Sequence, residues 1–387
     1  MLEVAHDTKI VYFKMKKFKS ITLLLFCLMS LVACNSTKSS DEILAECGSG
    51  VVLISNQYYY KITLPNGKMW YFTGFDEDGD LDGFTMDLSE VQKNRKMITG
   101  TGFFVSEDGK MMTNRHVADP SITLSDTKKS VRSLLAYITE IINNEMRSLS
   151  VKYNELEEAK KQCYSYNEYD GNIYVDREKL QEIETEQSSL QETFSNDSEI
   201  KDNIKTFDFS ELKVETVSEI GIAYNNTFVT KASDFIPCVV IAKSDKENID
   251  LATLQLKSKK TPEDKHIFEV TKEEKGFVDK VKGLFSSSDD DELKTEQKLY
   301  MIGFNAGLTL SNTSQGIKAQ ITSGTISQKS DNDKIMYTIP SLPGSSGSPV
   351  VNEKAQLVAV NFAGVNGTQS FNYGIQIKKV RQFMNEN

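Results

Sequence analysis

A turn rich in glycine and serine, Gly344–Pro349, lies between two apolar runs near the C-terminus. Such a turn folds the backbone tightly and points N–H groups inward, where they can bind the oxyanion that forms when a serine hydroxyl attacks a carbonyl. A Gly/Ser turn that only joins two strands has the same composition. The turn is therefore a candidate nucleophile loop, and it needs a histidine and a carboxylate elsewhere in the chain to support it.

His116 is the candidate general base. It follows a strand-like segment, Lys110–Thr113, and a histidine just past a buried strand is well placed to accept a proton. A packed or surface histidine is the plainer alternative. Another histidine, His266, lies in a charged segment, and we expect it to be solvated.

Asp250 is the candidate carboxylate, because it stands at the start of an apolar strand-like run, Leu251–Leu256. An aspartate at the mouth of such a strand is partly buried and can accept the Nδ1–H of a histidine, which orients the imidazole ring. Taken alone, Asp250 equally fits an ordinary aspartate at the edge of a strand.

Together these segments resemble the three signature blocks of the trypsin-like serine peptidases, in the order His, Asp, Ser. The blocks are Thr99–Phe104 with Thr113–Ala118, then Ile249–Leu254, then Gly344–Pro349. Their form is similar to two bacterial branches, the HtrA/Deg proteases and the staphylococcal V8-type glutamyl endopeptidases. The resemblance covers roughly residues 99–126, 208–256 and 298–387, a little over half of the chain without its N-terminal leader and its insertions.

The resemblance implies a catalytic role for each matching residue. It makes Ser346 the nucleophile, His116 the general base and Asp250 the residue that orients the imidazole. It places the oxyanion hole at the backbone N–H groups of Gly344 and Ser346. Ser348 replaces the second glycine of the commoner Gly-Asp-Ser-Gly-Gly-Pro motif.

Three residues near the end of the chain bear on substrate preference. The resemblance implies that Asn361, Phe362 and Ala363 line the pocket for the substrate residue that precedes the cleaved bond. The V8-type enzymes carry a histidine where Asn361 stands, and that histidine reads a substrate glutamate, so a glutamate preference is weakened. No aspartate lies close to Ser346 in the sequence to receive lysine or arginine. We therefore expect a small or apolar residue at this substrate position.

Many short strand-like runs separated by turn signals predict an all-β sandwich or barrel, with no βαβ alternation. The resemblance implies two antiparallel Greek-key β-barrels of the chymotrypsin type. The turn at Pro65–Gly67 predicts a hairpin between two such runs, and a terminal helix is expected over Lys378–Met384.

Two segments interrupt the predicted peptidase domain. Residues 125–205 are nearly free of glycine and proline and carry apolar residues at helical, heptad-like spacing, which predicts an inserted antiparallel helical hairpin of coiled-coil type. A charged, partly disordered loop is the alternative. Residues 257–297 are expected to form a charged surface loop. Loop-closure entropy grows only slowly with length, so a self-packed insertion between His116 and Asp250 is tolerable.

The N-terminus resembles a lipoprotein signal peptide over residues 1–33, with a basic stretch before an apolar run that is too short to span a membrane. Small residues precede Cys34, as in the lipobox of bacterial lipoproteins, so Cys34 is the expected lipidation site. A secretory peptide cut nearby, with an incidental cysteine, is the alternative. Residues 34–50 would then be a polar tether and residues 51–387 the peptidase domain, anchored at the periplasmic or surface face of a bacterial cell envelope.

The composition limits the possible partners. The 387 residues are 39% hydrophobic and carry a formal net charge of −10, which argues against a nucleic-acid partner. Cys47, Cys163 and Cys238 lack metal or disulfide spacing and are expected to be small buried residues. Asp76–Gly83 resembles the start of a calcium loop but lacks the acidic twelfth residue, so an acidic hairpin loop is the main expectation. No cofactor or metal is expected.

The sequence therefore predicts a lipid-anchored serine endopeptidase that works through an acyl-enzyme. The main alternative is a latent or inactive protease fold that binds an envelope partner through the helical insertion. A narrow processing enzyme that acts on one envelope protein is a third possibility.

Overall fold

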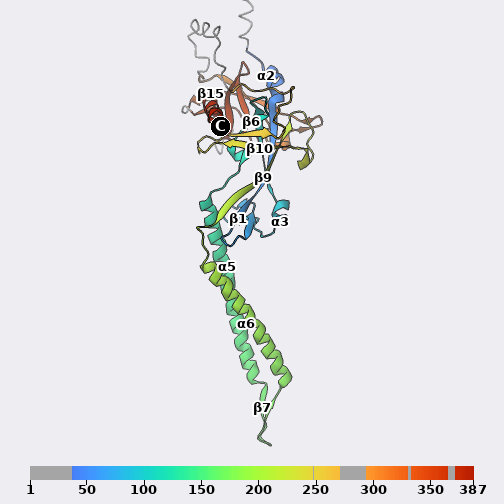
Figure 1. Ribbon diagram of the computed structural model, residues 1–387, viewed down its shortest axis with the longest axis vertical. Coiled ribbons are helices and arrows are strands. Elements are labelled where there is room, and N and C mark those ends of the chain that lie inside the picture. The colour runs from blue at the N-terminus through green and yellow to red at the C-terminus, as the bar shows by residue number, and fades with distance from the viewer. Residues whose placement is uncertain (1–36, 247, 271–292, 330–332, 365–370) are drawn as a thin grey trace, which may run out of the picture. The chain divides into compact units, whose positions relative to one another are not determined.

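The computed structural model describes residues 37–246, 248–270, 293–329, 333–364 and 371–387. The expected signal peptide and Cys34 lie outside the described residues. The chain divides into two compact units (Figure 1). The first unit comprises Met1–Asn56, Met97–Asp119 and Glu219–Asn387, and the second comprises Gln57–Lys96 and Pro120–Ser218.

One antiparallel barrel is built from six strands that pair in a ring, which the pairing of β1 with β9 closes. In spatial order the strands are β1 (Val51–Thr63), β5 (Lys96–Phe104), β6 (Lys110–Thr113), β11 (Ala252–Leu256), β10 (Ile236–Lys243) and β9 (Lys213–Tyr224). A seventh strand, β2 (Met69–Phe72), pairs with the outer part of β1, and a short 3-10 turn, η3 (Ala232–Asp234), precedes β10.

A second closed antiparallel barrel contains the serine-rich turn. In spatial order its strands are β12 (Lys298–Gly303), β15 (Gln320–Lys329), β16 (Lys334–Tyr337), β19 (Asn372–Gln376), β18 (Leu357–Gly364) and β17 (Pro349–Asn352). A short helix and a two-stranded ribbon, α8 (Leu308–Ser311), β13 (Asn312–Thr313) and β14 (Gly316–Ile317), lie between β12 and β15. The two barrels form a chymotrypsin-like fold, as expected, and the expected terminal helix is α9 (Ile377–Glu386).

Each barrel has a core of apolar side chains from the inward faces of its strands. Ile54, Phe104 and Leu254 are fully buried in the first barrel, and Met301 and Ile335 are fully buried in the second. Burying one such side chain contributes about 1.5–3 kcal/mol to folding, so these cores hold the loops between strands in fixed positions.

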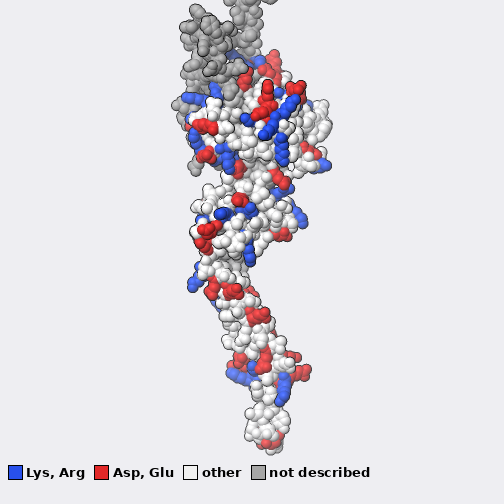
Figure 2. Space-filling view, viewed as in Figure 1, with Lys and Arg blue, Asp and Glu red and all other residues white. Residues whose placement is uncertain are grey.

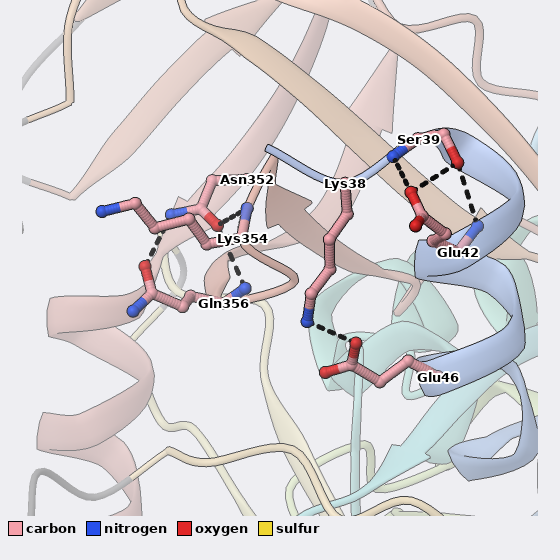
Figure 3. A network of polar contacts seen from close by, with 7 residues as sticks. All are labelled: Lys38, Ser39, Glu42, Glu46, Asn352, Lys354 and Gln356. Carbon is pink, nitrogen blue, oxygen red and sulfur yellow. Dashed lines mark hydrogen bonds and ion pairs between the residues drawn. The ribbon is translucent and has the colours of Figure 1, made fainter. Parts of the chain in front are cut away.

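The segment before β1 is a helix instead of the expected polar tether. Helix α2 (Ser40–Cys47) continues into a 3-10 turn, η2 (Gly48–Gly50), and Cys47 on its apolar face is fully buried. Ser39 and Glu42 form a reciprocal capping box at its start. Figure 3 shows this start beside the turn that follows β17, where the Lys38 N–H donates to the Glu353 carbonyl at 2.7 Å. The tether prediction was therefore wrong for residues 40–50, because the caps and the buried face stabilise a helix there.

The second unit is also larger than the sequence suggested. The hairpin predicted at Pro65–Gly67 is confirmed, and β1 and β2 pack against the base of the helical insertion. Their shared apolar cluster comprises Tyr60, Ile62, Leu64, Phe72, Val131, Leu135 and Leu212. Residues 57–96 were expected to belong to the peptidase domain, but this common core groups them with the insertion. The same unit contains β3 (Gly74–Phe75), β4 (Leu81–Asp82) and α3 (Leu88–Lys93).

The inserted helical hairpin is confirmed. Figure 1 shows α5 (Leu124–Lys161) and α6 (Arg177–Lys205) side by side, joined by a small ribbon of β7 (Tyr164–Tyr166) and β8 (Ile173–Val175). Surface ion pairs such as Lys160–Glu184, at 3.0 Å, and a 2.6 Å hydrogen bond from Gln187 Nε2 to Glu157 Oε1 join the two helices. No helix among the described residues, α5 and α6 included, is long and apolar enough to cross a membrane.

The segment after β11 differs from the expected charged loop. Phe268 is buried in the core, and the His266 ring packs edge-on against it, with ring centroids 4.7 Å apart. This burial lowers the pKa of His266, so the expectation of a solvated side chain was wrong. Residues 271–292 of the same segment lie outside the described residues. The expected burial of the cysteines Cys47, Cys163 and Cys238 is confirmed, and all three are free thiols.

Candidate active site

His116 lies on a single helical turn, α4 (Arg115–Ala118), directly after β6. The last carbonyls of a helix have no partner within it and need one from elsewhere. The fully buried Asn56 supplies it, because its Nδ2 donates to the carbonyls of Val117 and Ala118 at 3.0 Å each. The backbone that carries His116 is therefore fixed from both sides, by β6 and by Asn56.

Asp250 contacts His116 through both carboxylate oxygens. Oδ2 lies 2.6 Å from His116 Nδ1, and Oδ1 accepts the backbone N–H of His116 at 3.0 Å. An ionised carboxylate only accepts hydrogen bonds, so Nδ1 carries the ring proton and Nε2 is left as an acceptor. The Asp250 side chain is 16% exposed and the His116 side chain 43%, so the carboxylate lies behind the ring and the ring faces solvent.

Asn114 holds the backbone of Asp250. Its side chain is fully buried, and its Nδ2 donates to the Asp250 carbonyl at 2.8 Å. Arg115 makes a parallel contact, donating from Nη1 to the Ser244 carbonyl at 2.9 Å. These two residues precede His116 directly, so the segment that carries the histidine also fixes the aspartate.

The serine-rich turn lies between β16 and β17 and depends on two glycines. Gly344 and Gly347 have φ angles of +98° and +86°, a region that other residues rarely adopt. A Cβ on Gly347 would lie 2.2 Å from the Thr101 carbonyl oxygen and 3.1 Å from the Asn114 nitrogen. The turn therefore rests against β5 and against the segment that leads into His116.

Only one of the three serines in this turn is not buried. Ser345 and Ser348 are buried, whereas Ser346 is partly exposed. Within the part of the chain that the structure describes, Ser346 Oγ and His116 Nε2 have no hydrogen-bond partner, and they are not bonded to each other. The backbone N–H groups of Gly344 and Ser346 are also unpaired among these residues. A hydroxyl beside two unused N–H groups is the arrangement that attack on a carbonyl requires.

Asn361 holds the serine-rich turn through hydrogen bonds. Its side chain is 1% exposed, and its Nδ2 donates to the Ser345 carbonyl at 3.0 Å. Its Oδ1 accepts from the Tyr337 hydroxyl at 2.7 Å. The neighbouring Phe362 packs against Tyr373. Contact of Asn361 or Phe362 with substrate stays a prediction.

Ala363, the third residue expected to bind substrate, lies in β18.

The acidic loop Asp76–Asp80 connects β3 and β4 as a hairpin. Asp76 Oδ1 accepts the backbone N–H groups of Asp78 and Asp80, at 3.1 and 2.8 Å, so this carboxylate closes the turn. Among the residues that the structure describes, no three histidine, cysteine, aspartate or glutamate side chains cluster as a metal site would require.

Comparison with known proteins agrees with the fold. A family model for the trypsin-like peptidase domain matches residues 212–360 of the chain. This segment includes Asp250 and Ser346 and lies after His116. No curated protein matches the chain. The matched segment and the two six-stranded barrels together identify a trypsin-like serine protease fold.

Proposed function

We propose that this protein is a serine endopeptidase in which Ser346, His116 and Asp250 are the catalytic residues. The observation that carries the proposal is the pairing of His116 with Asp250 beside a turn that holds one partly exposed serine, Ser346, and two unpaired N–H groups. The trypsin-like family match supports the same reaction class. Protein or peptide is the corresponding substrate.

The reaction proceeds in two halves. Ser346 Oγ attacks the substrate carbonyl carbon while His116 Nε2 takes the hydroxyl proton. The oxyanion that forms accepts hydrogen bonds from the backbone N–H groups of Gly344 and Ser346. Asp250 stabilises the imidazolium. The C–N bond then breaks, and His116 gives its proton to the leaving amine. Water, deprotonated by His116, releases the acyl group and restores Ser346.

Substitution of the nucleophile tests this proposal. Wild-type protein should cleave a casein-type substrate and react with a fluorophosphonate probe, and Ser346→Ala should do neither. His116→Ala should also lose both activities, whereas His266→Gln should keep them, because the contacts of His266 are with Phe268 and Ser49, outside the proposed triad. A wild-type protein that takes no probe under any condition contradicts the assignment.

We also propose a small or apolar substrate residue before the cleaved bond. The buried amide of Asn361 is occupied by the turn and by Tyr337, so it presents no charge to a substrate. Sequencing the products from a peptide library measures the preference. Enrichment of glutamate, lysine or arginine at this position would contradict the proposal.

For localisation we propose a lipid anchor at Cys34 in the bacterial cell envelope. The support is the sequence pattern of an apolar run and small residues before this cysteine. Growth of producing cells with an alkyne-bearing fatty acid should label the wild-type protein and leave Cys34→Ser unlabelled. Equal labelling of both proteins, or of neither, contradicts lipidation at this residue.

A second candidate function is partner binding at the ribbon that ends the helical hairpin. Six large apolar or aromatic side chains are exposed there: Tyr164, Tyr166, Tyr169, Ile173, Tyr174 and Val175. Figure 2 shows the end of the hairpin as mainly uncharged surface with acidic residues, and residues 162–176 contain three carboxylates and no lysine or arginine. Clustered exposed tyrosines are typical of protein interfaces. We propose a protein partner that carries basic residues.

The partner test uses the full chain with Ser346→Ala, so that the partner is not cleaved. A partner captured from envelope extract should be lost when Tyr166→Ser and Tyr169→Ser are added. It should be retained with Tyr137→Ser, since Tyr137 on α5 is 64% exposed, close to the 67% of Tyr166, and lies outside the ribbon. Equal capture by all three proteins would contradict binding at the ribbon.

A further inference from the structure

Thr101 on β5 joins the two barrels at the serine turn through its backbone N–H and its hydroxyl. Its side chain is fully buried. Its backbone N–H donates to the Ser346 carbonyl at 2.8 Å, and its hydroxyl donates to the Gly344 carbonyl at 2.8 Å. The same hydroxyl oxygen accepts the Phe304 N–H at 3.0 Å, just past the end of β12. A hydroxyl has one proton to donate, so these contacts fix its direction.

The two carbonyls that Thr101 binds belong to the two residues whose N–H groups are left unpaired. Gly344 and Ser346 therefore each have a bound carbonyl and an open N–H, and one residue holds both carbonyls. Gly344 has a φ of +98° and no side chain of its own to restrain it. Without the Thr101 hydroxyl, nothing else among the described residues binds the Gly344 carbonyl.

We propose that Thr101 is a positioning residue for the oxyanion hole. The inference rests on the proposed peptidase function and adds a residue to the three proposed catalytic residues and the two proposed oxyanion donors. Oxyanion binding depends on donors placed about 2.7–3.1 Å from the developing charge, and displacement by about 1 Å can cost a factor of about 100 in rate. Thr101 acts through Gly344 and Ser346 and does not itself touch substrate.

The test compares Thr101→Val, which has the same shape but no hydroxyl, with Thr101→Ser, which keeps the hydroxyl. Thr127→Val is the matched control, because Thr127 is also fully buried and also donates its hydroxyl to a backbone carbonyl, Thr123, at 3.0 Å in the helical insertion. For each protein, the rate of fluorophosphonate labelling is measured against probe concentration and pH, together with the unfolding midpoint.

The expected result for Thr101→Val is a maximal labelling rate about 10- to 100-fold lower, in line with misplaced oxyanion donors. Half-saturation by the probe and the pH midpoint of labelling should stay unchanged, because probe binding and the His116–Asp250 pair are untouched. Thr101→Ser should restore most of the rate. Thr127→Val should label as wild type does, although its unfolding midpoint falls.

Three outcomes would overturn the inference. Thr101→Val labels at the wild-type rate, or Thr101→Ser loses as much as Thr101→Val, or Thr127→Val slows labelling in the same proportion. If Thr101→Val fails to fold, Thr101→Ala against Thr101→Ser makes the same comparison. Wild-type protein that takes no probe contradicts the peptidase function itself, which separates that failure from failure of the role given to Thr101.

Discussion

Asp250 holds His116 at two points, with 2.6 Å from Oδ2 to the ring Nδ1 and 3.0 Å from Oδ1 to the backbone N–H. The first contact fixes which ring nitrogen carries the proton. The second fixes the position of the residue. Because Asn114 binds the Asp250 carbonyl, the aspartate is itself immobilised. His116, Asp250 and Asn114 therefore form one hydrogen-bonded unit.

Replacing the carboxylate should uncouple this unit. Asp250→Asn retains the shape, but its amide can donate to Nδ1 and favour the wrong imidazole tautomer. We expect the labelling rate with fluorophosphonate at neutral pH to fall by a factor of about 10⁴, the size seen for such a change in a Ser-His-Asp triad. Asp264→Asn, at an exposed carboxylate that forms an ion pair with its neighbour Lys265, is the control. Undiminished labelling of Asp250→Asn would exclude the assigned role.

The close approach of Gly347 to the Thr101 carbonyl should make this position intolerant of a side chain. Gly347→Ala adds both a positive-φ strain of about 1–2 kcal/mol and a clash with backbone at 2.2 Å. Gly67→Ala is matched in φ, at +79°, but has nothing within 4 Å of the added Cβ. Denaturant unfolding should show a clearly larger loss of stability for Gly347→Ala than for Gly67→Ala. Equal losses would mean that the turn moves away freely.

His266 should make folding stability sensitive to mild acid. Burial lowers its folded-state pKa below the value of 6.5 for an exposed histidine. As the pH falls, the unfolded chain therefore takes up a proton before the folded chain does. The stabilisation is complete above about pH 6.5 and is lost as the pH falls from there toward the folded-state pKa. Unfolding free energies measured across this range should fall less steeply for His266→Gln than for wild type. The same dependence of unfolding free energy on pH in both proteins would contradict a contribution from His266.

Two buried thiols should be unreactive in the folded protein. Burial raises the pKa values of Cys47 and Cys238 to about 12, so almost no thiolate is present at neutral pH. Mass spectrometry after iodoacetamide treatment should find both residues unmodified in native protein and alkylated in denaturant. Rapid native alkylation of Cys47 would show that α2 leaves the barrel.

The candidate catalytic residues could be located from sequence because each lies in a short local motif, and the motifs occur in a meaningful order. Their supports could not. Thr101 binds Gly344 across 243 positions, and Asn56 binds the end of α4 across about 60, so no local pattern marks either residue. A buried threonine in a strand and a buried asparagine look like ordinary strand residues until the two barrels are assembled.

Two errors of the sequence interpretation, the tether over residues 40–50 and the solvated His266, have a similar cause. Residues 40–50 are mainly polar or small, so the burial of Ile43 and Cys47 against the barrels was not visible as a pattern. His266 is flanked by charged residues, but its packing on Phe268 and the contact of its backbone N–H with Ser49 Oγ at 3.0 Å are tertiary. The helical insertion was predictable because helical periodicity extends over many turns.

Ser346 is the proposed nucleophile, and locating the covalent adduct on the chain tests this role. Wild-type protein treated with a fluorophosphonate is digested, and the modified residue is identified by tandem mass spectrometry. We expect one adduct on Ser346, absent from Ser346→Ala and retained by Ser348→Ala, which removes a buried hydroxyl two residues away. An adduct on Ser345 or Ser348, or an adduct that persists in Ser346→Ala, would contradict it.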